Sequence, residues 1–173
     1  MVTDSFPMLV GDDEVISERQ LLSDVENGLL MESADSVRYI ILHCSATRED
    51  RDYTVEQLMR DHRRRGFRTV GYHFYIRRNG DLTQHRKLLE VGAHCRPYNR
   101  CSIGICYEGG LDAHGAPKDT RTPQQQEQLL LLLLRLHKLF PKAQIRGHNE
   151  MPHALPKSCP CFSSREYRYI EGL

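Results

Sequence analysis

Two histidines and one cysteine stand at positions from which side chains could bind a transition metal. His43 directly follows the apolar, β-branched segment 37–42, and His148 directly follows a second predicted strand, 143–147. Open α/β sheets place their functional groups just beyond the carboxyl ends of their strands. Cys159 lies in a loop with three prolines, which restrict the backbone and so hold a side chain in place. We therefore take these three residues as candidate metal ligands.

Two imidazoles and one thiolate supply three ligands of a tetrahedral zinc ion and leave its fourth position open for water. That arrangement is typical of catalytic zinc, whereas a structural zinc ion has four protein ligands. The sequence contains no Cys-x-x-Cys pair, and Cys159-Pro160-Cys161 is tighter than zinc-finger spacing. The chain has nine histidines and six cysteines, so spacing alone suggests zinc catalysis without establishing it.

Five segments are expected to form the strands that carry these residues. Segment 37–42 is rich in β-branched residues, and segment 71–78 alternates as a strand does. The Asn79-Gly80 dipeptide that follows favours a two-residue hairpin turn. The expected strands are 37–42, 71–78, 81–85, 102–107 and 143–147.

Two helices are predicted from capping boxes, in which a hydroxyl and a side-chain amide three residues later bond the backbone. The first helix begins after Thr54 and ends at Gly66, and the second begins after Thr122 and extends to about Phe140. The second contains the leucine run 129–134, which is apolar on all sides for almost two turns. This run is expected to be sandwiched inside the domain.

Strands and helices that alternate around one sheet indicate an α/β fold. The length of 173 residues suits a single domain with a real core and is short for two domains. Weaker apolar spacing suggests a short helix over 16–30 and a final helix from about Ser163. The predicted organisation is an N-terminal extension of unknown role, 1–36, followed by the functional domain, 37–173.

The charge balance argues against a nucleic-acid-binding protein, because 24 basic and 23 acidic residues leave a net charge of +1. Residues 60–68 form a local basic cluster. We interpret it as the solvated face of a helix. Attraction toward an anionic polymer such as cell wall is the alternative.

Irregular spacing of the six cysteines and the size of the chain argue against a disulfide framework. The first thirty residues carry acids throughout and do not have the pattern of a signal peptide. The longest apolar run, 129–134, is too short to span a membrane. Location stays open between the cytoplasm, phage-type release at lysis, and export with the signal already removed.

Six short motifs give the sequence a resemblance to a known family. They are His43-Cys-Ser-Ala-Thr47, Val70-Gly-Tyr-His-Phe74, Val91-Gly-Ala-His94, Tyr98-Asn99 with Ser102-Ile-Gly-Ile105, Gly147-His148, and Pro156-Lys-Ser-Cys-Pro160. Their order over about residues 37–165 resembles the N-acetylmuramoyl-L-alanine amidases of the type-2 amidase family, whose relatives include small phage amidases and peptidoglycan recognition proteins. The resemblance implies a mixed central sheet flanked by helices and hydrolysis of the amide between N-acetylmuramic acid and L-alanine. It also implies a Zn2+ cofactor, a peptidoglycan or muropeptide substrate and, as we expect, a monomer.

The resemblance also implies a role for seven individual residues. The zinc ligands are His43, His148 and Cys159, the catalytic residues are Tyr72 and Lys157, and the residues that line the groove for the stem peptide are His94 and Asn99. Zinc would polarise the scissile carbonyl and lower the pKa of its bound water to around 7. Lys157 could stabilise the oxyanion, by roughly 3 kcal/mol if it acts as a typical donor. Tyr72 could hydrogen-bond the attacking water or the leaving amine.

Some residues depart from the family pattern or offer alternatives to it. Cys161 places a second thiol near the site, where it could compete for the metal or oxidise with Cys159. His153 is a fallback ligand. Cys95 and Cys101 could pair, although free thiols are the expected state.

Two other functions compete with the zinc amidase. The first is a module that binds peptidoglycan without cutting it, but such relatives typically lack the cysteine ligand that Cys159 provides. The second is a metal-free cysteine hydrolase that uses Cys44 or Cys159 with a nearby histidine. Zinc content and inhibition by a chelator would distinguish these alternatives.

Overall fold

A computed structural model describes residues 5–7, 15–17, 28–154 and 157–173. Strands β1 (Ser5–Pro7) and β2 (Val15–Ser17) form an antiparallel pair. The helix predicted over 16–30 is therefore wrong at its start, because residues 16 and 17 belong to a strand. Its middle, 18–27, lies outside the described residues, and Leu30 at its end forms an isolated bridge with Glu90.

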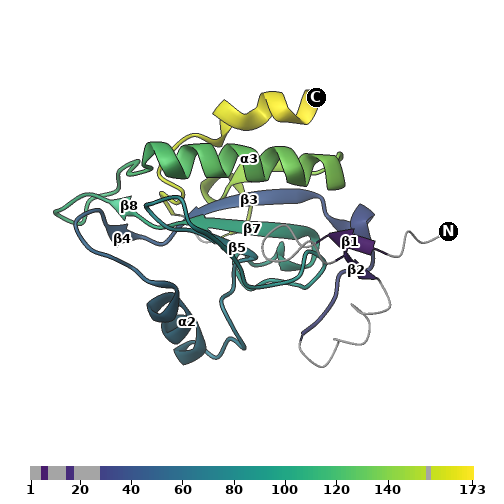
Figure 1. Ribbon diagram of the computed structural model, residues 1–173, viewed down its shortest axis with the longest axis horizontal. Helices are drawn as coiled ribbons and strands as arrows, with labels where there is room; N and C mark the ends of the chain where they lie inside the picture. The colour runs from purple at the N-terminus through teal and green to yellow at the C-terminus, as the bar shows by residue number, and fades with distance from the viewer. Residues whose placement is uncertain (1–4, 8–14, 18–27, 155–156) are drawn as a thin grey trace.

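A five-stranded mixed sheet forms the centre of the molecule, in the order β6-β5-β7-β3-β9 (Figure 1). The strands β5, β7, β3 and β9 are parallel, and β6 is antiparallel to β5. Their bounds are Tyr39–Cys44 for β3, Phe74–Ile76 for β5, Leu82–Gln84 for β6, Ser102–Tyr107 for β7 and Gln144–Gly147 for β9. The predicted α/β fold with one mixed sheet is confirmed.

Helix α3 (Pro123–Leu139) covers one face of this sheet (Figure 1). Alternate residues of a strand point to opposite faces, so Ile40, Leu42 and Cys44 of β3 join the core beneath α3. The helix begins at the predicted capping box, where Thr122 accepts a hydrogen bond from the Gln125 N–H.

The leucine run of α3 is only partly sandwiched. Leu132 and Leu133 are fully buried, whereas Leu131 is half exposed. The last helical segment, the 3-10 helix η5 (Ser164–Gly172), packs against α3 and β9 and starts where the final helix was expected. A helix that lies between a sheet and one further segment still has a side that faces solvent.

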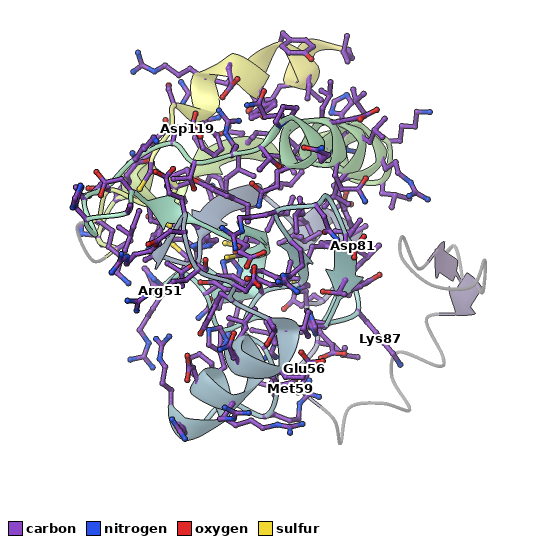
Figure 2. The ribbon with its side chains drawn as sticks, turned by 60° about the vertical axis from the view of Figure 1, so that its left-hand side comes forward. Arg51, Glu56, Met59, Asp81, Lys87 and Asp119 are labelled. Atoms are coloured by element: carbon purple, nitrogen blue, oxygen red, sulfur yellow. The ribbon has the colours of Figure 1, made fainter. Side chains whose placement is uncertain are left out.

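Helix α2 (Val55–Arg64) lies on the opposite side of the sheet from α3 (Figure 1). Its Leu58 packs with Tyr75 of β5 and Cys106 of β7, which form a second small core. The predicted capping box at Thr54 is present, and Gly66 takes a positive φ of 90° just past the helix. Figure 2 shows Glu56 and Met59 on this helix, at the edge of the molecule.

The basic cluster of 60–68 is largely a solvated surface, as interpreted from the sequence. Its exposed members are Arg60, Arg63, Arg64, Arg65 and Arg68, whereas His62 is buried.

The predicted hairpin is present with a longer turn. The Arg77 N–H donates to the Asp81 carbonyl, and the Gly80 N–H donates to the Arg77 carbonyl. These bonds define a three-residue loop in which Gly80 has a φ of 91°, so the two-residue turn is wrong. Strand β5 is also shorter than predicted, because the Gly71 N–H bonds the His62 ring instead of a neighbouring strand.

Short elements complete the fold around the strand ends. Strands β4 (Thr47–Arg48) and β8 (Gly110–Leu111) form a parallel pair beyond the ends of β3 and β7. The other 3-10 helices of the described residues are η2 (Ala34–Ser36), η3 (Asn99–Cys101) and η4 (His148–Glu150).

Residues 28–36 pack on the sheet domain. The Met31 N–H donates to the Leu89 carbonyl, and the Met31 side chain is 5% exposed within the main core. A boundary between residues 36 and 37 stays a prediction. Among the described residues, no helix has both the length and the apolar character that a membrane crossing requires.

Candidate functional site

His43 lies near the carboxyl end of β3, on the face opposite α3. The sequence placed it just after the strand, but parallel pairing with β7 continues through Cys44 and keeps His43 within the strand. His148 is the first residue after β9, the neighbouring parallel strand. Leu42 pairs with Gly147, so the two histidines come side by side with ring centroids 4.7 Å apart.

Cys159 comes from the loop that precedes η5, and hydrogen bonds from η4 and β7 hold this loop in place. The Asn149 N–H donates to the Cys159 carbonyl at 2.9 Å, and the Tyr107 hydroxyl donates to the Pro160 carbonyl at 2.7 Å. These bonds hold the thiol under the end of β3. Its Sγ atom lies 3.8 Å from His43 Nδ1.

The three side chains fit a zinc ion. Ligand atoms of His43, His148 and Cys159 lie within 4.8 Å of one another, and all three residues are buried. Two ligands of tetrahedral zinc, one nitrogen and one sulfur, stand about 3.5 Å apart, close to the His43–Cys159 separation. The Cys44 N–H donates to the Cys159 sulfur at 3.2 Å, which suits a thiolate.

Both histidines are held in the neutral form that a metal requires. Burial lowers the pKa of His43 well below its ordinary value, with smaller contributions from His94, His148 and Lys157. Burial and then Lys157 lower the pKa of His148 as well. Their nitrogen lone pairs are therefore available near neutral pH.

Tyr72 stands beside the histidines, two residues before β5. Its ring centroid lies 5.0 Å from that of His43. Burial raises the pKa of the Tyr72 hydroxyl well above its ordinary value, and the thiols of Cys106 and Cys159 raise it further. The phenol therefore keeps its proton and can donate a hydrogen bond.

A cleft of about 310 Å³ opens over these residues, between the sheet and α2. Lys157 lines this cleft and a second cavity of about 410 Å³ that continues from it. The residues shared by the two cavities are Arg65, Ala93, His94, His148 and Lys157. The cleft therefore joins the candidate metal ligands to a second cavity, which is lined by the cations Arg65, Arg96 and Lys157.

His94 and Asn99, predicted to line a substrate groove, both border the second cavity. Each also makes contacts within the protein. His94 Nδ1 lies 2.9 Å from His43 Nε2. Asn99 Oδ1 accepts hydrogen bonds from the N–H groups of His94 and Cys95, both at 2.9 Å.

The neighbouring thiols take no part in the metal cluster of the described residues, and neither does His153. Cys161 approaches Cys44, with the two sulfurs 3.9 Å apart. Cys95 and Cys101 are free, as expected, and so are the other four cysteines. A hydrogen bond with Cys159 and burial raise the pKa of Cys44 far above its ordinary value, which makes Cys44 a poor nucleophile.

Three residues near the site had no role at the site predicted from the sequence. Arg65 borders both cavities, but the sequence showed only its membership of a basic cluster. Ser102 and Gly104 contact His94 from β7. Strand alternation through 102–107 places Ser102 and Gly104 on the same face of the sheet, and this much could be predicted from the sequence. That His94 lies against this face could not be predicted, because His94 belongs to the loop between β6 and β7.

Comparison with known proteins agrees with this geometry. Residues 33–162 match the family described as N-acetylmuramoyl-L-alanine amidase. The endolysin of Enterobacteria phage K11 is 40% identical over 126 residues, which cover 73% of this chain and 82% of that protein. The endolysin of Klebsiella phage KP32 is 38% identical over 128 residues, or 74% and 83% of the two chains.

Solved structures share the fold. An N-acetylmuramoyl-L-alanine amidase endolysin from Clostridium intestinale superposes with a TM-score of 0.63 at 26% identity, over 78% of this chain and 80% of its own. The endolysin of Thermus scotoductus bacteriophage Ph2119 gives a TM-score of 0.67 at 23% identity, over 84% and 90%. Drosophila PGRP-LB gives 0.62 at 22% identity, over 76% and 78%.

Proposed function

Because the chain belongs to the N-acetylmuramoyl-L-alanine amidase family and is an amidase of peptidoglycan, we propose that it works with a zinc ion held by His43, His148 and Cys159. The observation that carries this proposal is the convergence of three buried ligand atoms from β3, η4 and the loop before η5. Three protein ligands would leave the fourth position of a tetrahedral zinc ion for water.

Bound zinc would supply a Lewis acid for the carbonyl and a water molecule acidic enough to react near neutral pH. The protein supplies the shape and the charges around that chemistry. Burial and the Cys44 N–H stabilise the ligands in the required ionisation states. The scissile bond in our proposal joins the lactyl group of N-acetylmuramic acid to L-alanine.

Lys157 and Tyr72 are the residues that we propose act on the substrate. Lys157 lines the cleft and can stabilise the negative charge that develops on the scissile carbonyl oxygen. Tyr72 stays protonated and can form a hydrogen bond with the attacking water or with the leaving amine. Each of these contacts strengthens as charge develops, which is the requirement for catalysis.

The adjoining cavity supports a peptidoglycan substrate. Peptidoglycan stem peptides carry free carboxylates, and the two cavities present Arg65, Arg96 and Lys157. We propose that the peptide lies along this positively charged surface, with His94 and Asn99 at its border. All of these groups lie within 37–173, so we propose that the chemistry belongs to that segment. We also propose that the protein acts as a monomer.

Metal analysis and digestion of purified peptidoglycan test the proposal together. Wild-type protein is expected to contain one zinc per chain and to release free L-alanine amino termini. Cys159→Ala is expected to lose both zinc and activity, whereas the matched control Cys101→Ala keeps both. Full activity in Cys159→Ala would refute the ligand set.

The same experiment separates the other candidate functions. A module that only binds peptidoglycan would retain the polymer without releasing new amino termini. A cysteine hydrolase would keep its activity in a chelator, whereas the proposed enzyme loses activity and recovers it when zinc is added. The raised pKa of Cys44 already argues against the metal-free route at that residue.

A further inference from the structure

A chain of hydrogen bonds runs from a backbone carbonyl to the first candidate ligand. The Ser102 hydroxyl lies 2.7 Å from the Tyr98 carbonyl oxygen and 3.3 Å from His94 Nε2. The other nitrogen of His94, Nδ1, lies 2.9 Å from His43 Nε2. The far nitrogen of His43, Nδ1, faces the Cys159 sulfur at 3.8 Å.

The direction of every bond in this chain follows from its first member. A carbonyl oxygen can only accept, so the Ser102 hydroxyl gives its hydrogen to Tyr98 and must accept from His94 Nε2. Nε2 of a neutral His94 then carries the ring hydrogen, and Nδ1 is the acceptor. His43 must donate from Nε2, which leaves the lone pair of His43 on Nδ1. That lone pair points to where the metal is proposed.

We propose that His94 is a positioning residue, which fixes the tautomer and the ring orientation of His43 so that Nδ1 is presented to zinc. The inference rests on the proposed function, since it concerns one ligand of that metal. Metal-binding histidines commonly donate their second N–H to a fixed acceptor, and loss of that acceptor weakens metal binding by about 10- to 100-fold. Here the acceptor is another imidazole.

The surroundings of His94 show that its ring is held from several sides. The backbone N–H of His94 donates to Asn99 Oδ1 at 2.9 Å, and this bond fixes the backbone of the loop. A Cβ on Gly104 would lie 2.6 Å from the Cγ of His94, so the glycine leaves the space that the ring fills. The His73 ring packs against it with centroids 5.9 Å apart.

A role in substrate binding alone makes different demands. The His94 ring would then need a nitrogen free for the peptide, but both nitrogens have partners inside the protein. Ser102 also has no reason to matter for such a role, because it is fully buried and does not line either cavity.

Two isosteric substitutions of His94 test the proposal without substrate. An asparagine side chain can place an acceptor near the position of Nδ1, whereas a glutamine side chain reaches the position of Nε2. Zinc affinity is measured by competition with a chelator of known affinity, and cobalt substitution reports the ligand geometry through its visible absorption spectrum. Thermal unfolding of the metal-free proteins shows that each variant folds.

We expect His94→Gln to bind zinc about 10- to 100-fold more weakly and to change the cobalt spectrum, whereas His94→Asn stays within about threefold of wild type. Ser102→Ala is expected to weaken zinc binding in the same direction as His94→Gln. If folded His94→Gln and Ser102→Ala keep wild-type zinc affinity and only KM for peptidoglycan rises, His94 is a substrate contact and the proposal is overturned. If wild-type protein itself binds no zinc, the proposed function fails first and this inference fails with it.

Discussion

Gly104 offers a test of the site that changes no polar group. Gly104 lies in the middle of β7 and has no positive φ, so alanine is compatible with its backbone. The added Cβ would lie 2.6 Å from Cγ, 2.7 Å from Nδ1 and 2.8 Å from Cδ2 of His94. The ring therefore has to move by about 1 Å to reach an ordinary carbon–carbon contact of roughly 3.5 Å.

Two free-energy terms of opposite sign set the expected stability of Gly104→Ala. Overpacking of a fitted interior costs about 1 to 3 kcal/mol. Replacing glycine also restricts the unfolded chain, which stabilises the protein by about 0.4 to 1 kcal/mol. We expect a net loss of about 1 to 2 kcal/mol in the free energy of unfolding, measured by urea denaturation in a chelator. A 1 Å shift is also enough to disrupt the His94–His43 bond, so zinc affinity should fall by about 10-fold or more.

The control variants decide whether the clash is the cause. Gly172→Ala meets nothing within 4 Å, so it should leave zinc affinity unchanged and should not lower the free energy of unfolding, which can rise by about 0.4 to 1 kcal/mol. In a His94→Ala background the clash is gone, so Gly104→Ala should no longer lower stability, and the double-mutant cycle should show strong coupling. Wild-type stability and zinc affinity in the single variant Gly104→Ala would refute this account of how His94 is held.

Three further predictions address catalysis, pH and folding. Lys157→Met should lower kcat by about 100-fold while zinc content stays at one per chain, and an unchanged kcat would remove Lys157 from the mechanism. Burial lowers the pKa of His73 to about 4 from its ordinary 6.5, so unfolding takes up a proton below pH 6.5. In metal-free protein, His73 should therefore cost no stability above pH 6.5 and about 2 kcal/mol of the free energy of unfolding by pH 5. The free energy of unfolding of His73→Gln should fall less steeply between pH 6.5 and pH 5 than that of wild type, and equal slopes would contradict this prediction. Thr122→Ala should cost about 1 kcal/mol in urea denaturation, because Thr122 Oγ1 accepts from the Gln125 N–H at 3.1 Å, and zinc affinity should not change. A stability equal to wild type would show that this cap contributes nothing.

Local signals explain how much of the fold could be predicted. The two capping boxes define the starts of α2 and α3, because the residues that satisfy the first N–H groups are adjacent in sequence. Strand β7 was predicted at its observed bounds from a continuous apolar run. The Asn79-Gly80 signal predicted a hairpin correctly, but it does not distinguish a two-residue turn from a three-residue turn with Gly80 at positive φ.

The candidate ligands could be chosen from sequence because His43 lies near the end of one strand and His148 directly follows the adjacent parallel strand. Once β3 and β9 pair in register, His43 and His148 must meet. The contact of His43 with His94 spans 51 residues and depends on the loop between β6 and β7, which has no periodic pattern. Chain length and composition contain no information about such a contact, so only the folded structure reveals it.

The need for a catalytic zinc ion is tested by titrating metal-free enzyme with zinc and counting the free L-alanine amino termini that it releases from purified peptidoglycan. We expect no release without metal and a linear rise in release that ends at one zinc per chain. Cys159→Ala is expected to release none at the same zinc concentration. Full release by the metal-free enzyme, or by Cys159→Ala, would contradict a catalytic zinc ion held by His43, His148 and Cys159.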